Sequence, residues 1–457
     1  MSLRPLRSPF ALTTPTGTNA VYARLRASLS RGIDPLGLVL FRVLLGLLFA
    51  FSALRFVLKG WVRPTYVEPS FHFRYSGFEW IPTPDLWLLY VLFGGMVLGG
   101  LGIALGALYR LSTGLWLVCF LWVELLDKST YLNHYYLMTL LGVLALVLPL
   151  HRSGSLDVRL GLVERWDRAP RWMLWLLRFQ IAVVYFFAGF AKLNADWLLR
   201  GEPMWTWLRG LDGVPLVSSL IAAQATAIAM SWAGALYDLT IPLWLSLQRT
   251  RTLAFLTVVL FHVMTWMIFP IGVFPWLMII SATLFFAPGW PRRLRFFRWH
   301  KLPQAPLADT SRLGGPMLAF VGLWCLLQVA IPLRFLAYPG EVNWNERGFR
   351  FSWRVMLIEK TGFIEYRVVD PSKDRSWLVS PRNELSPLQY KMLSTQPDMM
   401  EDYGRHLASR YADQGLSVQI YADSWVSWNG RPARPALDRN RDLANSASLG
   451  SWFDPAL

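Results

Sequence analysis

Charged residues are scarce in this chain. Only 16 % of the 457 residues are Asp, Glu, Lys or Arg, whereas 54 % are hydrophobic and 24 are tryptophan. The mean hydropathy is +0.34. The charges are excluded from several stretches long enough to cross a bilayer core of about 30 Å. This composition excludes a soluble enzyme and a disordered chain, and it indicates a polytopic membrane protein.

Cysteines and acidic residues are also few. The two cysteines, Cys119 and Cys325, both lie within apolar runs, so the sequence offers no disulfide between aqueous segments. The 29 Asp and Glu are outnumbered by 45 Lys and Arg, which gives a formal charge of +16. Basic residues gather at the cytoplasmic ends of membrane spans. Topology therefore explains the excess, and nucleic acid is not an expected partner.

The hydrophobic runs predict about nine transmembrane helices. They cover residues 36–58, 85–108, 111–126, 134–150, 172–191, 219–247, 252–269, 271–289 and 316–336. The first run follows Asp34-Pro35, a pair that suits a helix start. The two runs on either side of Pro270 are also compatible with one broken helix.

The distribution of arginines predicts the orientation. Five arginines precede the first run and five more lie in residues 151–171, and both segments fall on the same predicted side. Because short cytoplasmic loops are the basic ones, we expect a multi-pass membrane protein with a cytoplasmic N-terminus. The predicted divisions are a cytoplasmic segment (1–35), a transmembrane domain (36–336) and a C-terminal extracytoplasmic domain (337–457).

The C-terminal region has the composition of a small α+β domain. Its residues are mixed polar and charged from about 337 onward. The alternating segments Phe363–Val369 and Ser417–Val426 predict strands, and Pro387–Ala412 predicts a helix. The expected fold is therefore an α-helical polytopic membrane protein followed by a small α+β extracytoplasmic domain.

Three basic residues are predicted to lie at a similar depth toward the outer leaflet: His134, Lys192 and His262. Ionisable groups within a bilayer are costly, so they are natural candidates for function. The apolar segment 186–191 would desolvate the Lys192 ammonium and favour the neutral amine, which is a competent general base toward a phenol or quinol. Asp196, four residues further on, would instead keep Lys192 protonated if the two paired.

The segments around His134 and Lys192 resemble a known family. Residues 125–134 read LLDKSTYLNH, which is similar to the L-L-D-K-x-x-x-x-N-H segment of vitamin K-dependent γ-glutamyl carboxylases, whose membrane part is an HTTM-type domain. Residues 188–197 read AGFAKLNADW and resemble the A-G-x-x-K-L-x-A-D-W segment of that family. Collinear matches at 261–262, 271–274, 343–344, 352–353 and 419–427 extend the resemblance over roughly residues 36–445.

The resemblance implies an enzyme that uses vitamin K hydroquinone, of the phylloquinol or menaquinol type, with O2 and CO2 as co-substrates. It assigns to Lys192 the deprotonation of the hydroquinone and to His134 an assisting role in the same pocket. Oxidation by O2 then yields a base strong enough to remove a γ-proton from a peptide glutamate. CO2 adds to the resulting carbanion, and the vitamin leaves as its epoxide.

The resemblance also implies binding residues, and it implies no metal site. The residues expected near the hydroquinone are Asn133, Tyr185, His262 and Phe274. The residues expected to bind the substrate glutamate are Arg209, Trp344, Arg350 and Trp353.

Some features depart from the family pattern. In residues 344–353, WNERGFRFSW, Gly348 replaces a leucine and Arg350 replaces a glycine. The new guanidinium would either grip a carboxylate or block the channel. The chain also resembles a short homologue without the long luminal region of the animal enzymes, and their luminal disulfide has no counterpart here.

We therefore predict a vitamin K-dependent carboxylase-like enzyme that oxidises a naphthohydroquinone to its epoxide. The residues leave open whether γ-carboxylation of a peptide glutamate accompanies the oxidation. The alternative is a non-enzymatic membrane protein of the same fold that binds or processes a peptide. An electron carrier with His134 and His262 as haem ligands is disfavoured because neither belongs to a haem-attachment motif. The expected partners are the lipid bilayer, the hydroquinone and a glutamate-containing peptide or protein.

Overall fold

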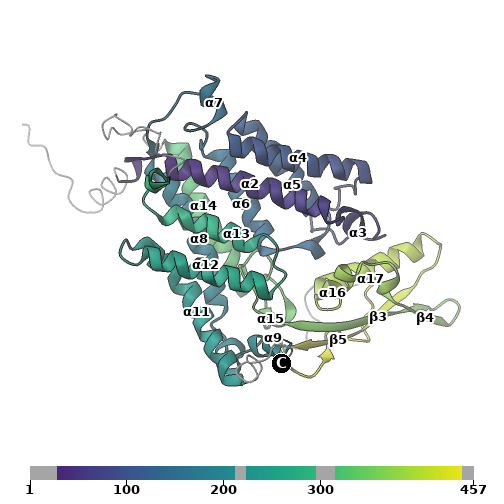
Figure 1. Cartoon of the computed structure of the whole chain (residues 1–457). Coiled ribbons are helices and arrows are strands. Elements are labelled where there is room, and N and C mark those ends of the chain that lie inside the picture. The colour runs from purple at the N-terminus through teal and green to yellow at the C-terminus, as the bar shows by residue number, and fades with distance from the viewer. Residues whose placement is uncertain (1–27, 211–222, 295–313, 445–457) are drawn as a thin grey trace, which may run out of the picture.

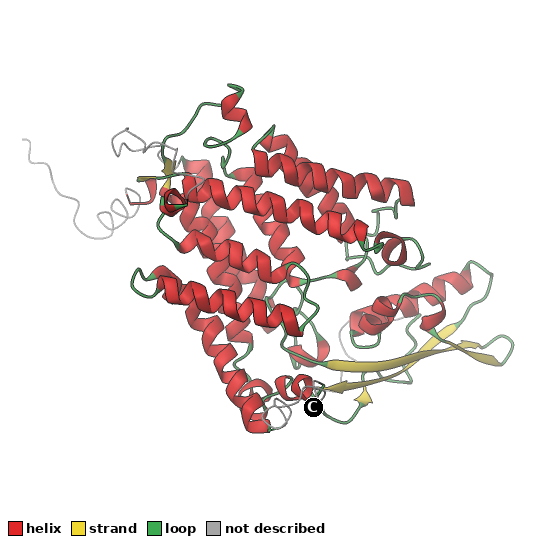
Figure 2. Cartoon of the chain, in the orientation of Figure 1, coloured by secondary structure: helices red, strands yellow, loops and turns green. Residues whose placement is uncertain are grey.

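The computed structural model describes residues 28–210, 223–294 and 314–444. Helices form a large bundle, and a small sheet with two helices lies beside one end of it (Figures 1 and 2). The helices of the bundle are α2 (Leu36–Leu58), α4 (Leu86–Leu105), α5 (Tyr109–Glu124), α6 (Asn133–Val147), α8 (Arg171–Ala191), α11 (Gln224–Ser246), α12 (Arg251–Ile268), α13 (Phe274–Ala282) and α14 (Gly315–Leu333).

Shorter elements connect these helices. They are β1 (Gly32–Ile33), α3 (Val62–Tyr66), η1 (Lys128–Thr130), α7 (Leu156–Arg159), β2 (Ala169–Pro170), η2 (Asp196–Arg200), α9 (Met204–Arg209), η3 (Thr283–Phe285), η4 (Trp290–Arg293), η6 (Arg334–Ala337) and α15 (Val342–Asn345). The strands β1 and β2 pair in antiparallel fashion and bring the starts of α2 and α8 together.

Each of the nine predicted runs contains a helix, but fewer helices have the length and composition of a span. Five of the described helices do: α2, α4, α8, α12 and the continuous stretch Gly315–Ala337. The helices α5 and α6 have 16 and 15 residues. Their length of about 24 Å or less is short of a hydrocarbon core of about 30 Å. A multi-span membrane protein is therefore supported, whereas nine complete spans remain a prediction.

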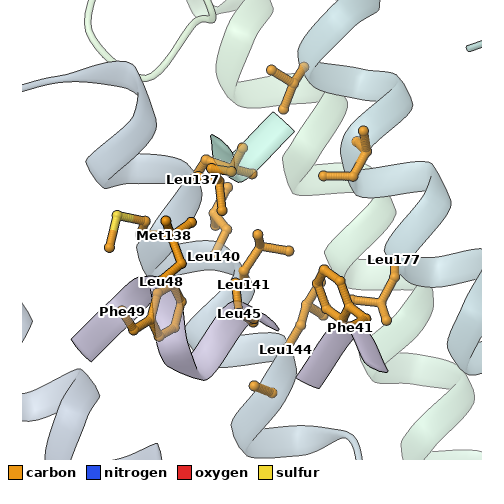
Figure 3. Packing of buried hydrophobic residues seen from close by; sticks show 14 of the residues in the cluster. Phe41, Leu45, Leu48, Phe49, Leu137, Met138, Leu140, Leu141, Leu144 and Leu177 are labelled. Atoms are coloured by element: carbon orange, nitrogen blue, oxygen red, sulfur yellow. The ribbon is translucent and has the colours of Figure 1, made fainter. Parts of the chain in front are cut away.

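The helices α2 and α6 contribute large apolar side chains to one buried cluster. Phe41, Leu45 and Phe49 come from α2, and Leu141 and Leu144 come from α6 (Figure 3). All five side chains are buried. Since lipid tails are as apolar as leucine, close packing rather than removal from water holds such helices together.

A close helix crossing depends on small residues. A Cβ atom on Gly100 of α4 would lie 2.6 Å from the backbone nitrogen of Ala50 on α2. The facing residue Gly46 is equally restricted, because a Cβ atom there would overlap the backbone at Ala104. Glycine at 46 and 100 thus allows α2 and α4 to approach to backbone contact.

Two arginines within the bundle bind backbone carbonyl groups. Arg42 is buried and donates hydrogen bonds to the carbonyls of Gly154 at 2.8 Å and Ala104 at 3.3 Å. Arg178 donates to the carbonyl of Leu284 at 2.8 Å. These contacts satisfy carbonyls near helix ends, which indicates a structural role for both arginines.

The C-terminal part is an α+β domain with its own core. Its antiparallel sheet has the order β4–β3–β5–β6, and the helices cover one face of it (Figure 2). The strands are β3 (Lys360–Asp370), β4 (Arg375–Val379), β5 (Gln419–Trp428) and β6 (Arg434–Pro435), and the helical elements are η7 (Pro381–Asn383), α16 (Pro387–Leu393) and α17 (Pro397–Ala412).

The predicted strands of this domain are confirmed, and its predicted helix is divided. Tyr366 of β3 pairs with Ala422 of β5, and both face the core with Ile364 and Val368. The helix predicted over 387–412 is interrupted at residues 394–396, where Pro397 begins α17. The short strands β4 and β6 were not predicted, because neither carries a strong alternating pattern.

A carboxyl group is buried within α17. Glu401 is 0 % exposed, and neither of its carboxylate oxygens has a hydrogen-bond partner among the described residues. A guanidinium nitrogen of Arg405 lies 3.7 Å from one oxygen. Burial raises the pKa of Glu401 from 4.5 to about 7.

We expect the C-terminal domain to lose stability as the pH rises from 4.5 to about 7. In this window the unfolded chain releases the proton of Glu401 while the folded domain retains it, so the free energy of unfolding falls with rising pH. The variant Glu401→Gln should therefore exceed the wild type at pH 8 by about 1–3 kcal/mol and match it at low pH. Hydrogen exchange of the α17 amides, corrected for the intrinsic pH dependence, measures this difference.

The matched control is Glu365→Gln. Glu365 is partly exposed on β3, and its replacement should leave the pH dependence of α17 protection unchanged. If Glu401→Gln kept the wild-type pH dependence of α17 protection, a group other than Glu401 would have to cause that dependence.

Candidate functional site

A cavity of about 440 Å³ lies among α8, α11, α12 and α13. Residues of α9, together with Val355 and Met356, also line it. Most of its wall is apolar or aromatic, but Lys192, Asp238 and His262 all contribute to it. Its size falls within the range of about 300–1,000 Å³ that is usual for small-molecule sites.

Lys192 forms a buried ion pair with Asp238. It caps the C-terminus of α8, and its Nζ atom donates to Asp238 Oδ2 at 2.8 Å and to the carbonyl of Ala188 at 3.2 Å. The Nζ atom also lies 3.5 Å from the carbonyl oxygen of Val355 and 5.1 Å from the ring centre of Trp197. Since only 6 % of Lys192 is exposed, protein groups rather than bulk water surround its amine.

A glycine of the lysine motif makes this pair possible. A Cβ atom on Gly189 would lie 2.8 Å from the backbone nitrogen of Leu239 and 3.1 Å from Cβ of Asp238. Glycine at this position therefore lets α11 approach α8 where Asp238 meets Lys192.

The alternative pairing of Lys192 with Asp196 does not occur, since Lys192 pairs with Asp238. Asp196 begins η2 and accepts hydrogen bonds from Arg431 at 2.6 and 2.7 Å and from Asn429 at 2.9 Å. Burial raises the pKa of Asp196, but the hydrogen bonds from Arg431 and Asn429 outweigh it and hold this pKa below its usual value. The sequence did contain a signal for the true partner, because Asp238 is the only acidic residue in positions 213–308.

Three of the residues expected near the hydroquinone line the cavity with Lys192. The hydroxyl group of Tyr185 lies 3.0 Å from Nε2 of His262, and both side chains are buried. The ring centre of Phe274 is 5.7 Å from that of His262 and 5.9 Å from that of His134. Because the phenyl ring contacts both histidines, they are not arranged as axial ligands on the two sides of a haem.

His134 and Asn133 do not line this cavity. His134 lies in the first turn of α6, next to the ring of Phe274. Its Nε2 atom is buried and has no hydrogen-bond partner in the described part of the chain. Asn133 accepts a hydrogen bond from the Tyr131 hydroxyl at 3.1 Å and donates to the carbonyl of Arg354 at 3.4 Å. A role for either residue beside the hydroquinone therefore stays a prediction.

The residues expected to bind a substrate glutamate also lie outside the cavity. Arg209 is exposed, and its guanidinium lies 4.5 Å from the ring centre of Trp205. Trp344 belongs to the core of the C-terminal domain. Trp353 is buried and stacks on Tyr136 at 4.9 Å. The structure thus does not gather these side chains into one site.

Arg350 is paired with a carboxylate of the protein itself. Its guanidinium donates to Asp398 Oδ2 at 2.7 Å and also to the side chain of Gln396. Lys128 Nζ lies 3.0 Å from the same Asp398 and also pairs with Asp402. Burial raises the pKa of Asp398, but the charges of Arg350 and Lys128 outweigh it and hold this pKa well below its usual range. Arg350 could bind a substrate carboxylate only if this pair opened.

The family-like motifs also attach the C-terminal domain to the bundle. Asp127 of the first motif accepts a hydrogen bond from Gln389 of α16 at 2.7 Å. Its neighbour Lys128 binds α17, as described above, and Asp196 of the second motif binds the segment after β5 through Arg431. Three polar contacts, made by the two motifs, therefore fix the domain against the helices.

The segment that joins the two parts has an unusual backbone. Within residues 346–356, four residues other than glycine have positive φ angles: Glu346 (55°), Phe351 (61°), Trp353 (59°) and Met356 (49°). Such conformations cost of the order of 1–3 kcal/mol each and are typical of functional segments. This one ends at Val355 and Met356 in the cavity wall.

The fold is that of a helical membrane protein, and it contains an apolar cavity with a buried ion pair in its wall. Comparison with protein families agrees with this description. The HTTM domain matches residues 30–290, and the vitamin K-dependent gamma-carboxylase lumenal domain matches residues 315–454. The chain belongs to the vitamin K-dependent gamma-carboxylase family. No solved structure matches the chain.

Family membership indicates where the two parts of the chain lie relative to the membrane. The apolar helices indicate a membrane protein, and the match to a lumenal domain indicates that the C-terminal region is extracytoplasmic. Membership of the family also implies its typical reactants, which are vitamin K hydroquinone, O2, CO2 and glutamate-containing proteins.

We predict that Asp196→Ala loosens the contact between the C-terminal domain and the helices. The change leaves the Arg431 guanidinium without its carboxylate, which should cost about 2 kcal/mol at this partly exposed site. Increased hydrogen exchange over β5 and β6 is the expected readout.

The variant Arg200→Ala is the control for this prediction. Arg200 contacts the same carboxylate at 3.4 Å, but its side chain is 45 % exposed, so its loss should have little effect. Equal effects of the two variants would contradict the role given to Arg431.

Proposed function

We propose that the chain is a carboxylase-like enzyme that oxidises a naphthohydroquinone with O2 to its epoxide. The observation that carries the proposal is the buried pair of Lys192 and Asp238 at the polar part of an apolar cavity. The second part of the proposal is that this oxidation drives γ-carboxylation of a peptide glutamate at the extracytoplasmic side, as the match to the lumenal domain supports.

The residues of the cavity fit a hydroquinone. Phe274, Tyr237 and Trp197 offer aromatic surfaces for a fused ring. Lys192 and the hydrogen-bonded pair of Tyr185 and His262 would hold its two oxygen atoms. When bound and oxidised by O2, the hydroquinone supplies a base stronger than any side chain, able to remove the γ-proton of glutamate before CO2 adds.

Asp238 allows Lys192 to act as a base without an isolated charge. Lys192 can accept a proton only when its amine is neutral, and a single buried charge would be costly. If Asp238 holds the shared proton, the amine and the carboxyl group are both neutral. After Lys192 takes a proton from its ligand, the new ammonium faces a ligand anion, so the net charge of the site stays at zero.

Residues 346–356, which include four residues other than glycine with positive φ angles, support a link between binding of the peptide and the proposed base Lys192. Residues 344–356 carry Trp344, Arg350 and Trp353, and the carbonyl of Val355 lies 3.5 Å from Lys192 Nζ. A peptide that displaced Arg350 from Asp398 would therefore act on the same short segment that contacts the base. In this proposal the N-terminus is cytoplasmic and the bundle contains nine spans.

One observation favours a second candidate function. Three of the four residues expected to bind glutamate are buried or already paired, namely Trp344, Trp353 and Arg350, and all four lie outside the cavity. This arrangement also suits a membrane protein of the same fold that binds or processes a peptide without quinone chemistry.

We expect Lys192→Ala to lower epoxide formation at least 100-fold, because it removes the base. The assay supplies purified protein with reduced vitamin K, O2, labelled bicarbonate and a glutamyl peptide, and follows epoxide and fixed label separately. Lys373→Ala, at an exposed turn between β3 and β4, is the control and should retain full activity.

Each result of this assay has a defined meaning. Normal epoxide formation by Lys192→Ala would place the base elsewhere. Epoxide without fixed label would indicate an epoxidase uncoupled from carboxylation. A wild-type protein that forms neither product would favour the non-enzymatic alternative.

We expect Asp238→Asn to retain epoxidation. Asparagine resembles a protonated aspartate, and it removes the negative charge that favours the ammonium form of Lys192. The rate of epoxide formation at neutral pH should therefore stay within about tenfold of the wild-type rate, since the amine that accepts the proton is kept. Complete loss of activity at every pH would show that Asp238 must be ionised.

A further inference from the structure

We infer that the protein has a second binding site, for a phosphate group, at the end of the bundle away from the C-terminal domain, and that an anionic membrane lipid supplies this phosphate. The site is a cavity of about 160 Å³ between the start of α2, the segment around α7, and η4. In Figure 1, α7 and the start of α2 lie at the opposite end of the bundle from the C-terminal sheet. The inference goes beyond the proposed function and does not depend on the chemistry at Lys192.

Cations outnumber carboxylates in the wall of this cavity. Three arginines and two aspartates line it, and each aspartate is paired with an arginine. Asp34 lies 2.6 Å from Arg292, and Asp167 lies 3.1 Å from Arg165. The third arginine, Arg159, forms no ion pair with a described residue. Its guanidinium is therefore available to an anion in the cavity.

Backbone amide groups in the wall are available as well. Arg42 donates hydrogen bonds to the carbonyls of Gly154 at 2.8 Å and of Ser153 at 3.3 Å. Because the C=O and N–H groups of a trans peptide unit point in opposite directions, the N–H groups of Gly154 and Ser155 point away from Arg42. Neither N–H group donates to another described residue, and both residues line the cavity. Successive free amides of this kind bind anions.

The turn that carries these amides is fixed before a ligand binds. The guanidinium of Arg42 holds its carbonyls, as described above. Gly154 has a φ angle of 55°, which favours glycine, and a Cβ atom there would lie 3.0 Å from Cγ1 of Val39 on α2. Since the turn is already ordered, binding of an anion requires little further loss of conformational entropy.

The surroundings favour a lipid headgroup as the source of the phosphate. Leu36 lines the cavity and begins α2, a candidate membrane span, so the cavity lies at the level of the headgroups. Leu160 and Leu162, directly after α7, are 69 % and 55 % exposed, which suits a segment that lies on the bilayer. Trp166 in the cavity wall belongs to a residue type enriched at this interface. A free phosphate ion would gain nothing from these apolar groups, whereas basic pockets between membrane helices bind anionic headgroups.

The first test measures lipid binding to the full chain in detergent by native mass spectrometry. Dioctanoyl phosphatidylglycerol is the anionic probe, and dioctanoyl phosphatidylcholine, whose headgroup has no net charge, is the reference. We expect one phosphatidylglycerol molecule to bind about tenfold more tightly than phosphatidylcholine. Arg159→Gln should lower the affinity for phosphatidylglycerol about fivefold, because it removes the guanidinium that no carboxylate compensates.

The matched control is Arg293→Gln. Arg293 is exposed in η4, next to Arg292, but it does not line the cavity. The control lowers the net charge at the same end of the bundle by the same amount, so its affinity should stay within about twofold of the wild-type value. Equal losses in the two variants, or the absence of a preference for phosphatidylglycerol, would overturn the inference.

The second test uses the unmodified protein, so it does not depend on the folding of a variant. Dioctanoyl phosphatidylglycerol should slow hydrogen exchange of residues 153–155, because the amides of Gly154 and Ser155 donate to its phosphate, and it should leave exchange of α17 unchanged. Inorganic phosphate at the same concentration distinguishes the two sources. Equal protection by inorganic phosphate would overturn the assignment to a lipid, and protection by neither probe would overturn the site.

Discussion

The ion pair of Lys192 and Asp238 is the constraint on which the functional site depends. The two residues are separated by 46 positions in the sequence and meet because α8 and α11 pack closely at Gly189. Neither charge would be tolerated alone in this apolar setting. In the proposed function, a proton shift within the pair supplies the neutral amine that acts as the base. Aromatic walls surround this polar centre.

The same short motifs serve two physical purposes. Gly189 and Lys192 build the ion pair, whereas Asp127, Lys128 and Asp196 hold the C-terminal domain against the helices. The segment between the two parts passes from the domain core to the carbonyl of Val355 beside the lysine. The attachment of the domain and the surroundings of Lys192 are therefore physically connected, as the proposed coupling between a peptide and a membrane-bound cofactor would require.

Much of this arrangement could be predicted from local sequence. Hydrophobic runs located the helices, and alternation located β3 and β5. The resemblance to the family indicated Lys192, Tyr185, His262 and Phe274, which line one cavity. The partner of Lys192 could not be found by helical spacing, since Asp196 lies beyond the end of α8 and turns toward Arg431. Similarly, the pairing of Arg350 with Asp398 depends on tertiary contacts that no local pattern records.

The most direct measurement is infrared difference spectroscopy on the binding of a hydroquinone, with Asp238→Asn used to assign the carboxyl bands. The account predicts that the ligand-bound protein shows a protonated Asp238 carboxyl group, because the proton has left Lys192. A carboxylate at position 238 in both states would contradict the account, since Lys192 would then remain an ammonium that cannot accept a proton.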